Sequence, residues 1–227
     1  MVNIGLVTLN GASKTYRRGT EEVRALRDVS VTLHPGELVG LAGPSGSGKS
    51  TLLNTLCGWE RPDAGTVAFG GELAGSDPAD LAWGRLALVP QTLGLLEDLS
   101  IEENILMPAR IAGNLGTQRK VAEELMAQFR IDHLARRYPR QVSLGEQQRC
   151  CVARALALSP DLVLADEPTA HQDADFTDIL FDRMRELSRQ GSAFLIATHN
   201  PDTWHHCDRV LSMSDGELRP GAPETVH

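Results

Sequence analysis

The stretch Gly43-Pro44-Ser45-Gly46-Ser47-Gly48-Lys49-Ser50 matches the pattern GxxxxGK[ST] in full. Its glycines allow the backbone to curl so that several N–H groups point at bound phosphates. Lys49 can reach the β- and γ-oxygens of a nucleoside triphosphate, and the Ser50 hydroxyl is a ligand for Mg²⁺. Because the short apolar run Leu38-Val39-Gly40-Leu41-Ala42 precedes the stretch, we predict a phosphate-binding loop that follows a buried strand.

A helix is predicted directly after this loop, over Ser50 to Cys57. Its leucines recur at helical spacing, and Gly58 is placed to end it. The positive end of such a helix favours a phosphate. We therefore include Thr51, in the first turn, among the nucleotide-binding residues together with the loop.

A second motif is acidic: a predicted buried strand ends in two carboxylates, in the stretch Leu162-Val163-Leu164-Ala165-Asp166-Glu167. Asp166 is predicted to hold Mg²⁺ through water, and Glu167 to polarise an attacking water molecule. Acidic pairs after strands are common, so this assignment depends on the phosphate-binding loop in the same chain.

His199 directly follows the predicted strand Ala193–Thr198. In a doubly wound sheet this edge exposes residues that face ligands, so His199 can contact a γ-phosphate. A single histidine at a strand end is more often structural, and its position alone leaves both interpretations open.

Ser143-Leu144-Gly145-Glu146 opens the predicted helix Gly145–Leu158 with an S-x-x-E capping box. One interpretation is that the box only caps the helix. The other is that the positive helix end also faces a phosphate. The local sequence favours the first interpretation.

Composition limits the possible classes of protein. The chain has 227 residues, enough for one core with a small subdomain, and a net charge of -8, which argues against a broad nucleic-acid surface. Its four cysteines show no CxxC spacing, and the adjacent side chains of His205-His206-Cys207 point in different directions, so a metal site there is not favoured. Residues 1–5 show no signal peptide, and no apolar run approaches the roughly 20 residues of a membrane span. We expect a soluble, cytoplasmic protein that reaches a membrane only through a partner.

Strands and helices are predicted to alternate, which indicates an α/β fold with a mainly parallel sheet covered on both faces. The first part is β-rich, and the stretch between about Thr92 and Ser159 is helical, consistent with a helical subdomain inserted into the core. The further predicted elements are strands at Leu6–Leu9, Val29–Leu33, Gly65–Gly70 and Arg209–Met213 and helices at Val121–Arg130 and Ala174–Gln190.

The set of motifs resembles the ATP-binding subunit of ABC transporters over almost the whole chain. Glu103-Asn104-Ile105-Leu106-Met107-Pro108 and Gln147-Gln148-Arg149 are similar to the lipoprotein-releasing and macrolide-exporter branch. The resemblance implies a P-loop NTPase (RecA-like) core, residues 1–91 and 159–227, with an N-terminal antiparallel β-subdomain. The helical subdomain would span about 92–158, in a single domain of 227 residues.

The resemblance also implies roles for residues outside the loop. Tyr16 stands where the family has an aromatic ring that stacks on adenine, and Gln91 at its Mg²⁺-sensing glutamine, which joins the core to the helical subdomain. His199 matches the family's switch histidine. Asp173 matches the aspartate of its dimer-contacting loop, although a helix cap is the local alternative.

Two departures from the family pattern stand out. The family signature usually reads LSGGQ, and Val142-Ser143-Leu144-Gly145-Glu146 occupies its place here; we call residues 142–146 the signature segment. In the family this segment presses on the γ-phosphate of the other subunit's ATP, so Ser143 and Gly145 would contact that nucleotide. The second departure is His171-Gln172-Asp173, where the family commonly has leucine before the aspartate. Both departures concern closure of the dimer more than ATP binding.

The resemblance thus implies an ATPase subunit that dimerises around two ATP–Mg²⁺. It would power a separate transmembrane permease, with export favoured, from the cytoplasmic face of the membrane, and without a nucleic-acid partner. Alternatives are an ATPase that drives a cell-envelope machine without solute transport and a regulatory subunit with weak hydrolysis. A non-transport ATPase of DNA repair, chromosome organisation or translation would usually carry long coiled coils or zinc modules, which the sequence lacks.

Overall fold

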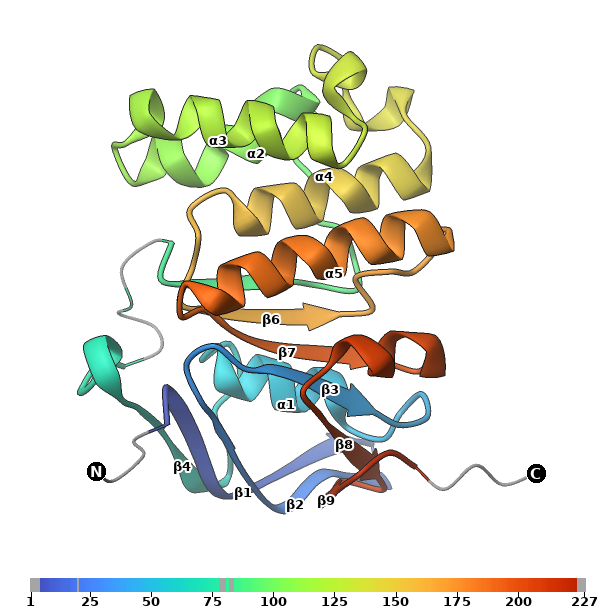
Figure 1. Ribbon diagram of the computed structural model, residues 1–227. Helices are drawn as coiled ribbons and strands as arrows, with labels where there is room; N and C mark the ends of the chain where they lie inside the picture. Colours follow the sequence, from blue (N-terminus) through green and yellow to red (C-terminus); the bar gives the residue numbers. More distant parts are fainter. Residues whose placement is uncertain (1–4, 20, 78–80, 82–83, 224–227) are drawn as a thin grey trace.

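The computed structural model describes the chain except for residues 1–4, 20, 78–80, 82–83 and 224–227. The prediction that residues 1–5 show no signal peptide therefore falls mostly on residues outside the described ranges. Figure 1 shows helices α2 (Ile101–Ile111), α3 (Leu115–Gln128) and α4 (Leu144–Leu156) at one end of the molecule and strands β1 (Val7–Arg18), β2 (Glu21–Leu33) and β4 (Ala64–Phe69) at the other, with strands β6 (Leu162–Asp166) and β7 (Ala193–Thr198) between them. In the described ranges, no helix has the length and hydropathy that a membrane span requires.

The larger sheet, within the described part of the chain, has six strands in the order β5-β6-β7-β3-β8-β9. Neighbouring strands from β5 to β8 are parallel, and β9 is antiparallel to β8. The bounds are β3 Leu38–Ala42, β5 Leu86–Val89, β6 Leu162–Asp166, β7 Ala193–Thr198, β8 Arg209–Ser214 and β9 Glu217–Pro220.

The central strands β3, β6 and β7 are buried along their whole length. Successive side chains of a strand point to opposite faces, and both faces are covered here. In β7, Leu195 packs in the cluster that contains helix α1 (Lys49–Leu56), whereas Phe194 and Ile196 pack in the cluster that contains helix α4 and helix α5 (Ala174–Arg189). This double coverage explains why these strands are continuous apolar runs in the sequence.

The smaller sheet is antiparallel, in the order β2-β1-β4, with β1 Val7–Arg18, β2 Glu21–Leu33 and β4 Ala64–Phe69. The strands β1 and β2 pair from Val7 opposite Leu33 to Arg18 opposite Glu21. The prediction found only their inner ends. The outer half of β2 is exposed and polar, so it lacks the apolar pattern that predicts a strand.

The helices are α1 Lys49–Leu56, α2 Ile101–Ile111, α3 Leu115–Gln128, α4 Leu144–Leu156 and α5 Ala174–Arg189. The predictions for α1, α4 and α5 agree within two residues, whereas α3 begins six residues before its predicted start. Helix α2 was not predicted as a helix, because its internal Pro108 is unfavourable inside a helix, although Ser100 and Glu103 form a complete capping box at its start.

The α/β fold class with an antiparallel β-subdomain and inserted helices is confirmed. Helices α2, α3 and α4 all lie within residues 92–158. The division into a core and a helical subdomain at those boundaries stays a prediction.

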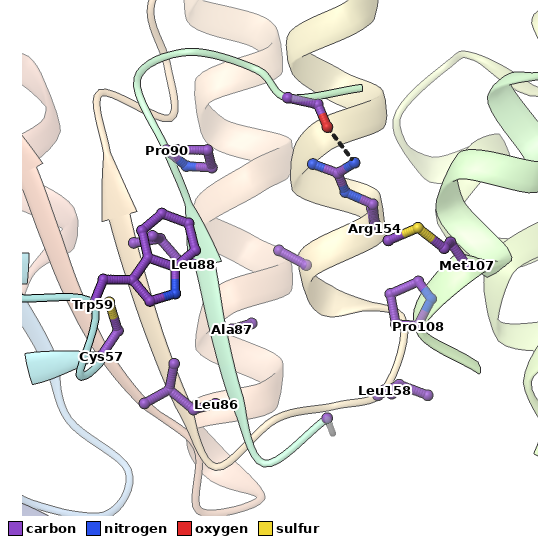
Figure 2. Close-up of a pocket in the computed structure, with 13 residues that line it drawn as sticks. Cys57, Trp59, Leu86, Ala87, Leu88, Pro90, Met107, Pro108, Arg154 and Leu158 are labelled. Atoms are coloured by element: carbon purple, nitrogen blue, oxygen red, sulfur yellow. Dashed lines mark hydrogen bonds between the residues drawn. The ribbon is translucent and has the colours of Figure 1, made fainter. Parts of the chain in front are cut away.

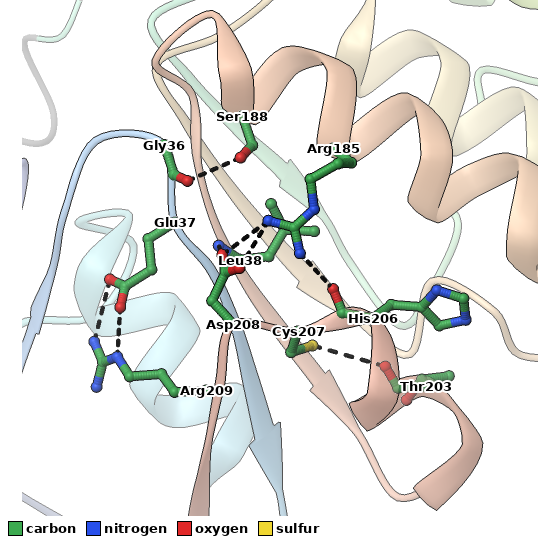
Figure 3. A network of polar contacts seen from close by, with 10 residues as sticks. All are labelled: Gly36, Glu37, Leu38, Arg185, Ser188, Thr203, His206, Cys207, Asp208 and Arg209. Carbon is green, nitrogen blue, oxygen red and sulfur yellow. Dashed lines mark hydrogen bonds and ion pairs between the residues drawn. The ribbon is translucent and has the colours of Figure 1, made fainter.

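Helix α5 is joined to the parallel sheet by polar contacts at its carboxyl-terminal half (Figure 3). Arg185 donates to both carboxylate oxygens of Asp208, at 2.8 and 3.0 Å, and to the carbonyl of His206. The same Asp208 accepts from the backbone N–H of Leu38, at the start of β3. This network fixes α5 against β3, the strand that leads into the phosphate-binding loop.

The capping box predicted at the start of α4 is present. Ser143 Oγ accepts from the N–H of Glu146 at 3.3 Å, and the Glu146 carboxylate accepts from the N–H of Ser143 at 2.7 Å. These hydrogen bonds from Ser143 lower the pKa of Glu146 below its ordinary value of 4.5. The anion introduced by Glu146 is therefore held against the backbone of its own helix.

We predict that Glu146→Gln lowers the free energy of unfolding by at most about 1 kcal/mol near neutral pH. Because the pKa of Glu146 is lower in the folded than in the unfolded chain, its carboxylate stabilises the fold above the unfolded pKa. This contribution is lost as the pH falls through the folded pKa. Urea unfolding from about pH 7 to about pH 3 should show the difference between variant and parent disappearing. Glu123→Gln, on the exposed side of α3, is the control, and a Glu146 effect of equal size at both ends of this range would contradict the assignment.

Candidate functional site

The loop Gly43–Ser50 connects β3 to α1 and has the backbone that its glycines predict. Gly43, Gly46 and Gly48 have φ of 152°, 81° and 109°, in the region that favours glycine. A Cβ at Gly43 would collide with the carbonyl oxygen of Met213, and one at Gly48 with that of Ala25. The loop is thus closely surrounded by backbone from β2 and β8, which explains why larger residues cannot replace these two glycines.

Lys49 is buried and curls back over its own loop. Its Nζ donates to the carbonyl oxygens of Gly43 at 2.7 Å and Pro44 at 3.0 Å. Burial lowers the pKa of Lys49, and the neighbouring carboxylates of Glu167 and Asp166 oppose this shift. An anion placed in the loop would compensate this desolvated ammonium better than two carbonyl groups do.

Ser50 and Asp166 bring the two predicted motifs together. The Ser50 hydroxyl, in the first turn of α1, donates to Asp166 Oδ2 at the end of β6, at 2.6 Å. Burial raises the pKa of Asp166; the Ser50 hydrogen bond opposes that shift, and the neighbouring Glu167 adds to it. A buried carboxylate in this state is expected to gain from a cation.

Glu167 and His199 are also in direct contact. Glu167 has φ of 52°, unusual for a residue with a side chain, and its Oε1 accepts from the N–H of His199 at 3.1 Å. His199 Nδ1 lies 2.7 Å from the same oxygen, so the ring is oriented by the carboxylate. The Glu167 side chain is only 13% exposed and that of His199 is 73% exposed, which leaves the other ring nitrogen available to a ligand.

A pocket of about 320 Å³ gathers most of the predicted site. Tyr16 and Val23 from the smaller sheet line it opposite the loop, and Gln91 joins it from the segment after β5. The remaining lining residues are Ala25, Ser45, Gly46, Gly48, Lys49, Ser50, Thr51, Asp166 and Glu167.

A neighbouring cleft of about 810 Å³ shares Ser45, Gln91 and Glu167 with this pocket. Leu144 of the signature segment and His199 line it as well. The Leu144 side chain is 51% exposed, so it stands free at the start of α4. The pocket and the cleft together open a continuous surface from the phosphate-binding loop to the signature segment.

Six of the predicted residues line neither of these hollows: Gly43, Pro44 and Ser47 of the loop itself, and Ser143, Gly145 and Asp173. Ser143 and Asp173 are exposed, and each caps a helix, since Asp173 Oδ1 accepts from the N–H of Phe176 at 2.8 Å. Their local role as caps is thus observed.

The oxygen set suits Mg²⁺. Ser50 and Asp166 present a hydroxyl and a carboxylate 2.6 Å apart, and hard cations prefer such oxygen ligands. Ser47 Oγ is buried in the loop without a hydrogen-bond partner in the described structure, which is consistent with a loop shaped for an additional polar group. The His205-His206-Cys207 run forms no metal-binding cluster, because no three His, Cys, Asp or Glu side chains in the described ranges are grouped suitably.

Two residues at the site, Gln148 and Val23, were not predicted to belong to it. Gln148 is buried in α4, and its amide lies 3.4 Å from the carbonyl oxygens of both Glu167 and Pro168. Val23 lies in the pocket beside Tyr16 and is 39% exposed. The available signals for Gln148 were its place in the stretch Gln147-Gln148-Arg149 and its polar type on the buried face of a helix, and nothing local marked Val23.

The chain is similar to known proteins over nearly its whole length. A family model described as ABC transporter matches residues 26–170. The lipoprotein-releasing system ATP-binding protein LolD of Maricaulis maris is 42% identical to the chain, over 96% of the chain and 98% of its own length. An uncharacterized ABC transporter ATP-binding protein of Mycobacterium tuberculosis is 39% identical, over 95% of the chain and 89% of its own length.

Solved structures are similar over the same extent. A dimeric post-hydrolysis state of the ATP-binding cassette MJ0796, bound to ADP and Pi, superimposes with a TM-score of 0.85 at 30% identity, covering 93% of this chain and 96% of its own. A second dimeric structure of MJ0796, a bacterial ABC transporter cassette, gives 0.84 at 29% identity, with the same coverage. The family match and the close relatives therefore show that the chain belongs to the ATP-binding cassette family of ABC transporters.

Proposed function

We propose that this chain hydrolyses ATP as a dimer, and that closing and opening of the dimer drive a separate permease in the membrane. The observation that carries the proposal is the single pocket in which Lys49, Ser50, Asp166 and Glu167 meet beside Gln91. The chain would then lie at the cytoplasmic face of the membrane, attached through the permease.

In the proposed ground state the loop binds the triphosphate. Backbone N–H groups of the loop and the first turn of α1 face the phosphates, and Lys49 exchanges its two carbonyl contacts for phosphate oxygens. Tyr16, across the same pocket, is placed to stack on the base. Ser50, Asp166 and Gln91 would hold Mg²⁺, which neutralises charge that develops on the phosphates.

The proposed base is Glu167, which accepts a proton from the attacking water. His199 orients this carboxylate through its backbone N–H and its ring, and its exposed side would contact the γ-phosphate that the water attacks, with ADP as the leaving group. The left-handed backbone of Glu167 is consistent with a functional residue, because such strain is retained where the surroundings hold it for a purpose.

The second copy completes the site in this proposal. Ser143 and Gly145 start α4 at a positive helix end that is exposed in the single chain, so they are free to approach the ATP of a partner. Asp173, exposed at the start of α5, would contact the partner subunit. The dimeric structures of a similar cassette support this arrangement.

The permease is proposed to dock in an apolar groove of about 380 Å³ beside the nucleotide pocket (Figure 2). Trp59 is 71% exposed and lies over β5, facing Leu88, with Met107 and Pro108 of α2 on the far side. Pro90 lines the same groove and precedes Gln91, so a helix seated there would touch the segment that enters the nucleotide pocket. The occupant we propose is a short permease helix with an apolar face.

The similarity to lipoprotein-releasing system ATP-binding proteins favours a lipoprotein-releasing or exporting system for this chain. Specificity for the transported molecule would lie in the permease. A second candidate is a regulatory subunit that binds ATP and hydrolyses it weakly. Leu144 favours it, because its exposed side chain stands where the family has glycine and where two copies would close.

Lys49→Ala should weaken ATP binding roughly 10- to 100-fold, because each lost hydrogen bond to a charged group costs about 1.5 to 3 kcal/mol. The measurement is equilibrium titration of the isolated chain with a fluorescent ATP analogue. Lys120→Ala, which removes an exposed lysine from α3, is the matched control. Unchanged affinity in the Lys49 variant would rule out the phosphate-loop assignment.

Glu167→Gln should reduce turnover by about a hundredfold or more, since it removes the proposed base and keeps the shape of the side chain. It should accumulate an ATP-bound dimer, visible by size-exclusion chromatography with ATP and absent with ADP. Glu124→Gln on α3 should behave like the parent chain. If the Glu167 variant hydrolyses ATP at the parent rate, Glu167 is not the base.

Trp59→Ala should reduce capture by the permease about tenfold or more, because truncating a tryptophan at the centre of an interface often costs about 2 kcal/mol. The measurement is co-purification of this chain with a co-expressed candidate permease, from membranes in mild detergent. ATP binding should stay unchanged. Tyr138→Ala, an exposed aromatic that does not line the groove, is the control, and equal capture of the two variants would place the docking site elsewhere.

A further inference from the structure

The two departures from the family pattern are in physical contact. Gln172 Nε2 donates to the carbonyl oxygen of Gly145, in the first turn of α4, at 2.9 Å. Its Oε1 accepts from Arg149 Nε, one turn further along the same helix, also at 2.9 Å. A leucine at this position could make neither hydrogen bond. We call Gln172 with these two bonds the Gln172 clip.

Arg149 is a rigid anchor for this clip. Its side chain is 17% exposed, and its guanidinium lies 4.5 Å from the centre of the Phe176 ring in α5. A second nitrogen lies 3.8 Å from Asp173, and a third contact reaches the carbonyl of Phe129 at 3.4 Å. Because these contacts hold Arg149 from several sides, the Gln172 amide has a fixed acceptor and donor orientation.

The Gln172 clip leaves little space for a side chain at Gly145. A Cβ added at Gly145 would lie 3.2 Å from Gln172 Nε2 and 3.2 Å from the carbonyl oxygen of His171. Both contacts are tighter than ordinary packing. Gly145 therefore lets the loop of residues 171–173 approach the start of α4 closely within one chain, independently of any phosphate.

The loop of residues 171–173 belongs to a longer segment, residues 167–173, that begins at the proposed base Glu167. Gln148, also on α4, reaches the carbonyl oxygens of Glu167 and Pro168. Helix α4 is thus joined at two points to the segment 167–173, once near the base and once at the clip. A displacement of α4 would be transmitted to this segment at both points.

We infer that Gln172 is a positioning residue that joins the signature segment to the segment carrying Glu167. When α4 closes on a partner's ATP, Gln172 would then fix the position of residues 171–173, the loop of its own chain that faces the partner. The inference rests on the proposed dimer. Its consequence is that the two ATP sites of a dimer depend on each other through Gln172. The clip also fixes the start of α4 where Leu144 replaces a glycine.

The first test uses the chain with Glu167→Gln, which accumulates the dimer, and adds Gln172→Met or Gln172→Glu. Methionine has nearly the same length and removes both polar ends. Glutamate keeps an acceptor for Arg149 and replaces the donor to Gly145 by an anion. Both should raise the ATP concentration for half-maximal dimer about tenfold, since losing these bonds costs on the order of one decade in an equilibrium constant.

The fluorescent ATP analogue should bind each single variant as tightly as the parent, because the clip touches no residue of the phosphate-binding loop. Gln128→Met, on the exposed end of α3, is the matched control. A half-maximal concentration within about twofold of the parent would overturn the inference. A parallel loss of affinity in the isolated chain would also overturn it, because the effect would then be general damage to the fold.

A second measurement does not depend on the trapped dimer. With Glu167 intact, Gln172→Met should lower turnover at saturating ATP about tenfold while the affinity of the single chain stays constant, a split that simple destabilisation does not produce. Unchanged turnover would overturn the inference. If Glu167→Gln alone forms no dimer, the proposed function fails, whereas a dimer indifferent to Gln172 rejects only this inference.

Discussion

The hydrogen bond from Ser50 to Asp166 is the contact on which the rest of the site depends. It joins the first turn of α1 to the end of β6, two segments separated by 116 residues. The contact is possible because β3, β7 and β6 are parallel neighbours, so that their carboxyl ends lie along one edge of the sheet. At that edge the phosphate-binding loop follows β3 and His199 follows β7. Asp166 is the last residue of β6, and Glu167 comes directly after it.

This edge concentrates charge in a partly dry place. Lys49 is buried beside two carboxylates, and burial lowers its pKa while it raises that of Asp166. Each charged group is therefore held less favourably than in water, and the carbonyl oxygens of Gly43 and Pro44 compensate the ammonium only in part. In the proposed function, a triphosphate with its cation would supply the missing anion and cation together. The unfavourable charge arrangement of the single chain would then be a source of differential binding, which is what a ligand requires to shift a conformational equilibrium.

The parts of the fold that the sequence predicted are those with a dense local signal. The strands Leu38–Ala42 and Ala193–Thr198 were predicted to the residue, because both faces of each are buried and turn signals or glycines flank them. Helix α2 was missed since Pro108 masks its pattern, and the outer hairpin of β1 and β2 was missed because it is polar. The candidate site was predicted largely by resemblance and motif. Gln148 and Gln172 could not be predicted, because their hydrogen bonds join residues about 20 positions apart or more and leave no periodic trace.

Two different constraints act on the residues at the start of α4, and the sequence motif alone does not distinguish between them. Its capping box and its exposed positive end suit a partner's phosphate, whereas Gly145 is also closely packed against His171 and Gln172 of its own chain. Of the two glycines usual at this point, the one that is kept is the one whose Cβ would meet the loop, and the one that is replaced, at Leu144, has its side chain half exposed. Packing within the chain therefore explains which glycine this sequence can lose. The restraint at Gly145 acts within the chain, whereas the half-exposed side chain at position 144 meets no comparable restriction from the loop of residues 171–173.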